Sequence, residues 1–234
     1  MLLKKLRNEV LQANLELQRK GLVLYTFGNA SGISRSKRLV VIKPSGVPYE
    51  NLTANMLVVT DLEGRVVEGD LRPSSDLATH LVLYKQFPTI GGVAHTHSEY
   101  ATAWAQARHP IPCFGTTHAD YFHGPVPVTP ELDDSEIAGD YEKNTGEVIA
   151  RMFDAIDYAA VPGVLVASHG PFTWGKDAMT AAETAVVLEM LARTAYLTIG
   201  IDRGAGAISP ALQDKHYLRK HGTTAYYGQV RNQE

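Results

Sequence analysis

The chain has 234 residues, with 22 Lys and Arg against 25 Asp and Glu, which gives a formal net charge of −3. A weakly acidic chain has no broad positive field, so nucleic acid and anionic membranes are not expected as partners. The length suffices for one hydrophobic core, and we expect residues 1–234 to form one domain. Cys113 is the single cysteine, which excludes an internal disulfide and predicts a reducing compartment, most simply the cytoplasm.

Helix and strand signals alternate along the first half of the chain. Charges interrupt the apolar residues of the N-terminal MLLKKLRNEV, so neither a signal peptide nor a membrane span is expected. Apolar periodicity and turn residues predict a helix at 2–20 that stops at Gly21, strands at 22–27 and 39–43, and a hairpin over 57–69. A helix is predicted up to Phe87 with Ser74 or Ser75 as N-cap, then a strand at 91–97 and a helix at 98–107.

The second half continues this alternation after a segment rich in Pro, His and aromatic residues. We predict loops with short strands at 109–130, a helix at 134–156 with a break near Asn144, a buried strand at 163–168, and helices at 177–200 and 209–222. Because no change in composition separates these elements, the chain is predicted to be an α/β protein.

Three histidines occur where predicted strands end. His95 and His97 are two positions apart, so strand alternation would place both side chains on one face, and His169 directly follows the strand GVLVAS. Three imidazoles with an open position are typical of a catalytic divalent metal, and Asp76 offers an oxygen ligand. Spacing alone leaves metal binding the minority interpretation, and His80 at i+4 can simply pair with Asp76.

Three segments rich in Gly and Ser lie beside strand ends, at Gly28–Gly32, Ser45–Gly46 and Ser74–Ser75. Small residues let the backbone approach an anion, and Ser74–Ser75 precedes a predicted helix whose dipole favours phosphate. Lys43 adds a positive charge. For any one segment alone, a turn with a capping serine is the more common explanation.

The segment GPFTWGK at 170–176 matches the first seven positions of a phosphate-binding P-loop. The next residue is Asp177, where that motif requires Ser or Thr to hold magnesium. Pro171, Phe172 and Trp174 also replace the small residues that let amides wrap a phosphate. We therefore reject nucleotide binding at this segment.

Several longer segments follow one another over almost the whole chain: GNASG, KPSG, PSSD, AHTH, GTTHADYFHGPVPVTP, SHGPFTWG, HYLRKHG and AYYGQ. Together they resemble the class II aldolase family, and in particular its ribulose-phosphate 4-epimerase branch. The resemblance implies a three-layer αβα fold with a mostly antiparallel central sheet. It also implies a homotetramer whose active sites lie between neighbouring subunits.

The matching motifs imply roles for individual residues. The implied metal ligands are His95, His97 and His169, with Asp76 as a weaker fourth. The implied acid/base pair is Asp120 and Tyr227. The implied substrate-binding residues are Gly28, Asn29, Lys43, Ser45, Gly46, Ser74 and Ser75, with Thr116 and His216 also lining the site. The implied metal is Zn²⁺, and imidazole ligands accept Mn²⁺ or Co²⁺ as well.

The implied reaction interconverts L-ribulose 5-phosphate and D-xylulose 5-phosphate in pentose catabolism of the L-arabinose type, although an ascorbate-type route fits equally. The C4 hydrogen is not acidic because the ketone is two carbons away, so the family route is retro-aldol cleavage of C3–C4. The aldehyde then turns and is attacked on its other face. A divalent cation stabilises the developing negative charge, and Asp120 and Tyr227 serve one face each.

Two other hypotheses remain. A phospho-sugar aldolase would release its aldehyde, but in those enzymes the residue matching Asp76 is typically Glu, so Asp favours the epimerase. A structural module such as the adducin head domain shares the fold. Such a module has no need for three ligand histidines together with an acid/base pair.

Overall fold

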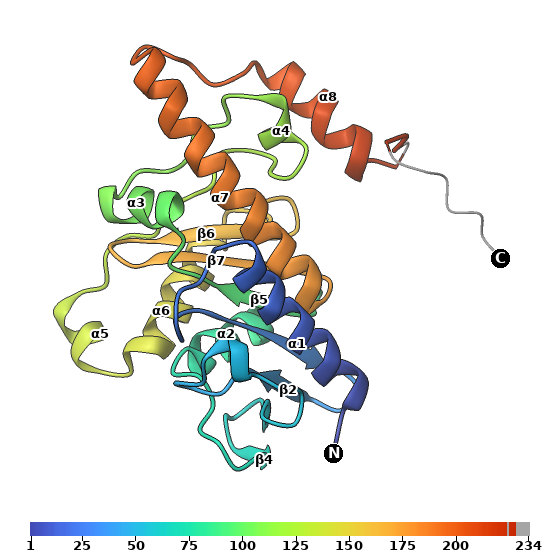
Figure 1. Cartoon of the computed structure of the whole chain (residues 1–234). Helices are drawn as coiled ribbons and strands as arrows, with labels where there is room; N and C mark the ends of the chain where they lie inside the picture. The colour runs from blue at the N-terminus through green and yellow to red at the C-terminus, as the bar shows by residue number, and fades with distance from the viewer. Residues whose placement is uncertain (224, 228–234) are drawn as a thin grey trace.

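The computed structural model describes residues 1–223 and 225–227, and Figure 1 shows their path. The helices are α1 Lys4–Arg19, α2 Leu77–Gln86, α3 Glu99–Ala107, α4 Thr116–Ala119, α5 Asp134–Ala138, α6 Tyr141–Met152, α7 Ala178–Ile201 and α8 Pro210–His221, with a 3-10 turn, η1, at Tyr49–Asn51. The strands are β1 Asn29–Ser34, β2 Leu39–Ile42, β3 Val58–Asp61, β4 Val66–Glu68, β5 Gly92–His95, β6 Gly163–Val166 and β7 Gly170–Gly175. These strands form one sheet in the order β4-β3-β2-β1-β5-β7-β6, with every neighbouring pair antiparallel.

Helices cover both faces of this sheet (Figure 1). Successive strand residues point to opposite faces, so Val40 and Ile42 of β2 join a core with α2 and α6. Val41, between them, joins a second core with α1 and the first half of α7. The predicted three-layer α/β fold with a mostly antiparallel sheet is therefore confirmed.

The first strand begins later than its sequence pattern indicates. The strand predicted at 22–27 is wrong, because this segment forms a turn in which Tyr25 has a φ of 53°. β1 starts instead at Asn29, inside the GNASG segment that we expected to interrupt a strand. Small residues are needed there because a Cβ at Gly32 would lie 2.9 Å from side-chain atoms of α1.

Strand β7 is absent from the predicted elements, because its sequence GPFTWG has Gly at both ends and no alternation of polar and apolar residues. The segment is nevertheless a buried strand paired with both β5 and β6. A buried strand has no loop of free amides to wrap a phosphate.

Two helix boundaries also differ from the prediction. The N-cap of α2 is Asp76 rather than Ser74 or Ser75. The helix predicted at 134–156 breaks at Gly139 and Asp140 rather than near Asn144.

Helix α7 is the longest element and passes through both cores. Among the described helices it alone is long and apolar enough to cross a membrane, with a mean hydropathy of 1.4, a test that core helices also pass. Its first half packs between the sheet and α1, as a core helix does. Its second half extends beyond the sheet toward α4 and α8 (Figure 1), where Tyr196, Leu197 and Ile201 are 62%, 50% and 89% exposed.

Candidate metal centre and substrate cavity

Three histidines from two segments of the chain converge at one end of β5. His95 is the last residue of β5, His97 lies two residues further on, and His169 sits in the turn between β6 and β7. The Nε2 atoms of His95 and His97 are 3.1 Å apart, and each of the three offers a ring nitrogen within 4.8 Å of the others. The side chains therefore lie together as the sequence pattern predicts, although β5 ends at His95 instead of running through His97.

Strand β7 orients the His95 ring. The Nδ1 atom of His95 donates a hydrogen bond to the Pro171 carbonyl oxygen at 2.9 Å, and the ring stacks on Phe172 with centroids 4.1 Å apart. Because a carbonyl oxygen only accepts, the proton of the neutral ring sits on Nδ1 and the Nε2 keeps its lone pair. The Tyr141 hydroxyl lies 3.4 Å from Nδ1 of His169.

Burial keeps His97 and His169 neutral at physiological pH. Burial, with smaller effects of His95 and His97, lowers the pKa of His169 to about 4. Burial also lowers the pKa of His97. Neutral imidazole is the form that binds a divalent cation, so this set of donors fits such an ion.

Asp76 stands beside these histidines at the N-cap of α2. Its Oδ2 accepts a hydrogen bond of 2.6 Å from the Asn29 amide. Burial alone would raise the pKa of the Asp76 carboxyl, but His95, His80 and the Asn29 amide together hold it below its usual value. His80 does not pair with this carboxylate, because its Nδ1 lies 2.7 Å from the Ser31 hydroxyl.

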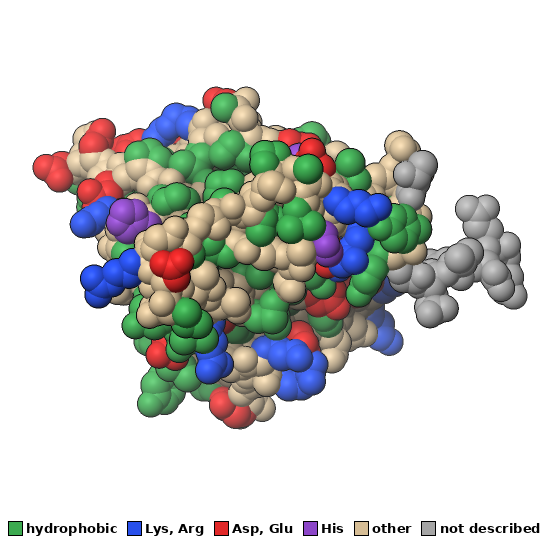
Figure 2. Space-filling view, turned by 90° about the horizontal axis from the view of Figure 1, so that it is seen from above, with side chains coloured by type: hydrophobic (Ala, Val, Ile, Leu, Met, Phe, Trp, Pro, Cys, Tyr) green, Lys and Arg blue, Asp and Glu red, His purple; other side chains and the backbone are tan. Residues whose placement is uncertain are grey.

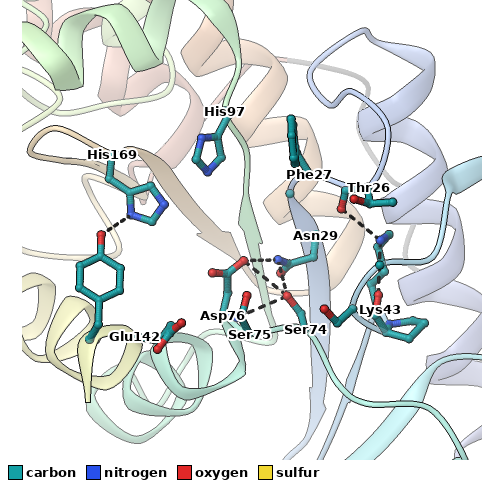
Figure 3. A pocket seen from close by; sticks show the side chains of 15 residues that line it. Thr26, Phe27, Asn29, Lys43, Ser74, Ser75, Asp76, His97, Glu142 and His169 are labelled. Carbon is teal, nitrogen blue, oxygen red and sulfur yellow. Dashed lines mark hydrogen bonds between the residues drawn. The ribbon is translucent and has the colours of Figure 1, made fainter. Parts of the chain in front are cut away.

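A cavity of about 400 Å³ opens beside the histidines. It is lined by Thr26, Phe27, Gly28, Asn29, Lys43, Pro44, Ser45, Gly46, Ser74, Ser75, Asp76, His97, Tyr141, Glu142 and His169. Figure 3 shows its two ends: His97 and His169 lie on one side and Lys43 on the other. Asn29, Ser74 and Asp76 are hydrogen-bonded to one another between them.

Lys43 is a buried cation with no acidic partner among the described residues. Its ammonium lies 3.4 Å from the carbonyl oxygens of Thr26 and Pro44, and 4.8 Å from the centroid of the Tyr49 ring. Burial lowers its pKa to about 8, so it is mostly protonated at neutral pH. A buried ammonium without a counter-ion, close to the first turn of α2, suits an anionic group of a ligand.

Five cavity residues are missing from the sequence prediction: Thr26, Phe27, Pro44, Tyr141 and Glu142. The first three adjoin predicted segments and could have been found by extending those segments by one or two residues. Tyr141 and Glu142 begin α6, which reaches the cavity because α6 packs against α2. No local pattern in the sequence signals that contact.

Four residues of the predicted site lie elsewhere in the chain. They are Thr116 and Asp120 at the two ends of α4, His216 on α8, and Tyr227 just beyond α8, and none of them lines the cavity. Asp120 lies 3.2 Å from the Nδ1 of His216, so the two belong to one cluster. One chain therefore holds the histidine cluster and the predicted acid/base pair in two separate places. Residues 228 and 229 of the AYYGQ motif lie outside the described residues.

Comparison with protein families shows the class of protein to which this site belongs. Residues 8–196 match the Class II Aldolase and Adducin N-terminal domain family, and the chain belongs to that family. The resemblance found in the sequence motifs is therefore confirmed. The aldolases of this family are metal-dependent, in keeping with the histidine cluster.

Individual proteins of known name are also similar to this chain. The L-ribulose-5-phosphate 4-epimerase UlaF of Salmonella paratyphi A is 53% identical over 227 residues, which cover 97% of this chain and all of that protein. The protein of the same name from Salmonella typhi is equally similar. Among solved structures, an L-fuculose 1-phosphate aldolase has a TM-score of 0.79 at 24% identity, covering 93% of this chain and 96% of that one. The L-fuculose-1-phosphate aldolase of Thermus thermophilus has a TM-score of 0.67 at 22% identity, covering 88% and 100%.

Proposed function

We propose that the chain is a metal-dependent phospho-sugar 4-epimerase that interconverts L-ribulose 5-phosphate and D-xylulose 5-phosphate in pentose catabolism. The observation that carries this proposal is one cavity with neutral histidines at one end and, at the other, the ammonium of Lys43, which has no acidic partner within residues 1–223 and 225–227. This arrangement suits a substrate with oxygens for a metal at one end and a phosphate at the other. The name and high identity of the Salmonella relatives support the same reaction.

His95, His97 and His169 would hold a divalent cation, with Asp76 as a further ligand. Zn²⁺ suits the three imidazoles, and Mn²⁺ or Co²⁺ are accepted by the same donors. When bound, the cation supplies Lewis acidity that stabilises the negative charge developing on the sugar oxygens during C3–C4 cleavage. The Pro171 carbonyl keeps His95 in the tautomer that can bind it.

The opposite end of the cavity would hold the phosphate. Lys43 supplies the positive charge, while Gly28, Asn29, Ser45, Gly46, Ser74 and Ser75 line the wall beside it. The phosphate end anchors the aldehyde fragment while that fragment turns to present its other face. Keeping both fragments in one cavity makes the recombination effectively unimolecular.

Asp120 and Tyr227 would move the proton of the C4 oxygen, one on each face. Arg219 and His216 hold the pKa of the Asp120 carboxyl below its usual value despite partial burial, so it is a carboxylate at neutral pH and can accept this proton. The Tyr227 hydroxyl can donate one to the alkoxide on the other face. Thr116 and His216 lie in the same region of the chain and would line this side of the site.

We propose further that the working enzyme is a homotetramer in which each cavity receives Asp120 and Tyr227 from a neighbouring subunit. The separation of the two clusters within one chain supports this arrangement, as does the exposed apolar end of α7. Figure 2 looks onto the end of the molecule that carries this part of α7 and shows apolar side chains spread over that surface. The chain would work as one domain, since all described strands join one sheet, and in the cytoplasm, since Cys113 is a buried free thiol.

An assay with L-ribulose 5-phosphate tests this function. We expect purified protein to form xylulose 5-phosphate, to lose this activity in excess chelator and to regain it with Zn²⁺. Accumulation of free glycolaldehyde phosphate would indicate an aldolase instead. Absence of any conversion by metal-loaded protein would contradict the proposal.

A further inference from the structure

The side chain of Arg219 makes a two-point contact with Asp120. Its Nε donates to Oδ1 of Asp120 at 3.0 Å and its Nη2 donates to Oδ2 at 2.7 Å. Both oxygens of one carboxylate are thus held by one planar guanidinium, the geometry that fixes an Arg–carboxylate pair most firmly. A lysine cannot reproduce this contact, because its ammonium is a single point charge.

The same guanidinium also contacts Tyr227. Its Cζ atom lies 4.7 Å from the centroid of the Tyr227 ring. The backbone N–H of Tyr227 donates to the Arg219 carbonyl oxygen at 3.1 Å, so the main chain after α8 folds back onto Arg219. Arg219 therefore contacts both members of the predicted acid/base pair: its guanidinium contacts Asp120 and the Tyr227 ring, and its backbone carbonyl contacts the Tyr227 backbone.

We infer that Arg219 is the positioning residue of the acid/base pair, joining Asp120 and Tyr227 into one preformed unit. The inference rests on the proposed function, since it assigns that unit to the C4 oxygen of the phospho-sugar. The reaction needs two proton-transfer groups at a fixed separation, because the C4 oxygen faces opposite directions before and after inversion. A guanidinium between them fixes that separation before substrate arrives.

Arg219 acts within a larger charged group. The titratable and charged side chains that face the Asp120 carboxylate are His216, Arg219 and Lys220, all from α8; His221 lies against the Asp120 carbonyl oxygen, and Lys220 lies over the Tyr227 ring. Figure 2 shows Lys and Arg side chains gathered beside a histidine on one side of this end of the molecule. Of these groups only the Arg219 guanidinium binds both carboxylate oxygens and contacts the tyrosine.

A merely structural role for Arg219 would be to attach α8 to the α4 segment. The hydrogen bond between His123 Nε2 and Asp214 Oδ1, 2.7 Å long, attaches α8 to the same segment without touching Asp120 or Tyr227. Asp214→Asn is therefore a matched control: it weakens the attachment of α8 and leaves the acid/base pair untouched.

The test compares Arg219→Lys, Arg219→Ala and Asp214→Asn in the full, zinc-loaded protein. We expect Arg219→Lys to keep its zinc and its KM but to lose about a hundred-fold in kcat, because small displacements of catalytic groups are costly. Arg219→Ala should show the same loss, partly restored by added guanidinium ion. As the pH is lowered, its rate should also begin to fall at a higher pH than that of the wild type, because without the Arg219 cation the pKa of Asp120 rises. Asp214→Asn should retain the wild-type kcat.

Three outcomes would overturn the inference: wild-type kcat in Arg219→Lys, an equal loss in Asp214→Asn, or no shift of the pH profile in Arg219→Ala. If Arg219→Ala does not fold, Arg219→Lys still decides. The ¹³C-NMR titration of the Asp120 carboxyl separates this inference from the proposed function. An unchanged titration in Arg219→Ala refutes the clamp itself, whereas a shifted titration in that variant, alongside a wild-type protein that does not epimerise L-ribulose 5-phosphate, refutes only the reaction.

Discussion

At the scale of single residues, the metal centre depends on which ring nitrogen each histidine leaves free. His97 lies past the end of β5 and lines the cavity, with its Nε2 3.1 Å from that of His95. We predict that His97→Asn loses bound zinc and the epimerase activity, because an amide is a poor substitute for an imidazole ligand. Metal analysis and the L-ribulose 5-phosphate assay measure both.

The control for this change is His109→Asn. His109 is exposed and lies outside the substrate cavity, so its variant should keep both zinc and activity. Full activity in a His97→Asn protein that contains no metal would refute the proposed centre.

Two buried histidines predict an acid-sensitive fold. Burial lowers the pKa of His118 to about 4 and that of His80 to about 3, from an ordinary value of 6.5. The unfolded chain therefore takes up protons first as the pH falls, and the free energy of unfolding drops from pH 6.5 downward until the folded protein titrates too. For His118 this loss is on the order of 3 kcal/mol between pH 6.5 and 4.

Urea unfolding of chelator-treated protein at a series of pH values checks this expectation. In His118→Gln, which keeps a donor for the Gly124 carbonyl oxygen, the slope between pH 6.5 and 4 should be smaller than in the wild type. Equal slopes in the two proteins would contradict a neutral, buried His118.

Residue chemistry could be predicted from sequence where it follows a local pattern. His95, His97 and the serines before α2 carry such patterns; the structure places His97 and the serines in one cavity and His95 beside it in the histidine cluster. The burial of Lys43 and the contact of Tyr141 with His169 depend on packing between distant segments, which no local pattern contains.

At the scale of elements, the segment that leads into β1 packs tightly against the end of β5 beside the candidate metal centre. Gly28 has a φ of +70°, and a Cβ there would lie 2.8 Å from the His95 carbonyl oxygen. We predict that Gly28→Ala is destabilised by left-handed strain of about 1 kcal/mol and by a clash of about 1–3 kcal/mol. Urea denaturation measures the sum.

Gly21→Ala is the matched control for this pair of effects. Gly21 has the same φ of +70°, but nothing lies within 4 Å of its Cβ position, so only the strain remains. Equal destabilisation in the two variants would show that the clash at Gly28 adds no cost, which would contradict the prediction.

Elements with strong periodicity could be predicted from sequence, and α1, β2, the β3–β4 hairpin, α7 and α8 agree with the prediction within a few residues. β1 and β7 could not. β1 consists mostly of small residues and β7 has Gly at both ends, because helices and neighbouring segments approach their backbones closely at the glycines. Glycines that predict a turn when the sequence is considered alone are needed in these two strands for tight packing.

At the scale of the whole molecule, the proposed site needs more than one chain. We predict that mixing inactive Asp120→Asn subunits with inactive His95→Asn subunits restores part of the activity. A mixed assembly contains some cavities with an intact histidine cluster facing an intact acid/base pair. Activity measured after dissociation and reassembly at several ratios tests this arrangement.

Each variant mixed only with itself is the control and should stay inactive. If no ratio of the two variants restores activity, sites built between subunits are excluded.

The three-layer order of the fold could be predicted only through resemblance, because strand direction leaves no mark on composition. The separation of the two clusters within one chain likewise becomes visible only in three dimensions.

Helix α8 has no fully buried side chain and meets the α4 segment through polar contacts, among them the Asp120–Arg219 ion pair and the hydrogen bond between His123 and Asp214. Dissolved salt screens charges most where they are exposed, and the Asp120 and Arg219 side chains are only 10% and 24% exposed. The outer contacts of α8 are therefore more sensitive to the surrounding solution than this pair. Concentrated brine would loosen the outer contacts of α8 well before it separated Arg219 from Asp120.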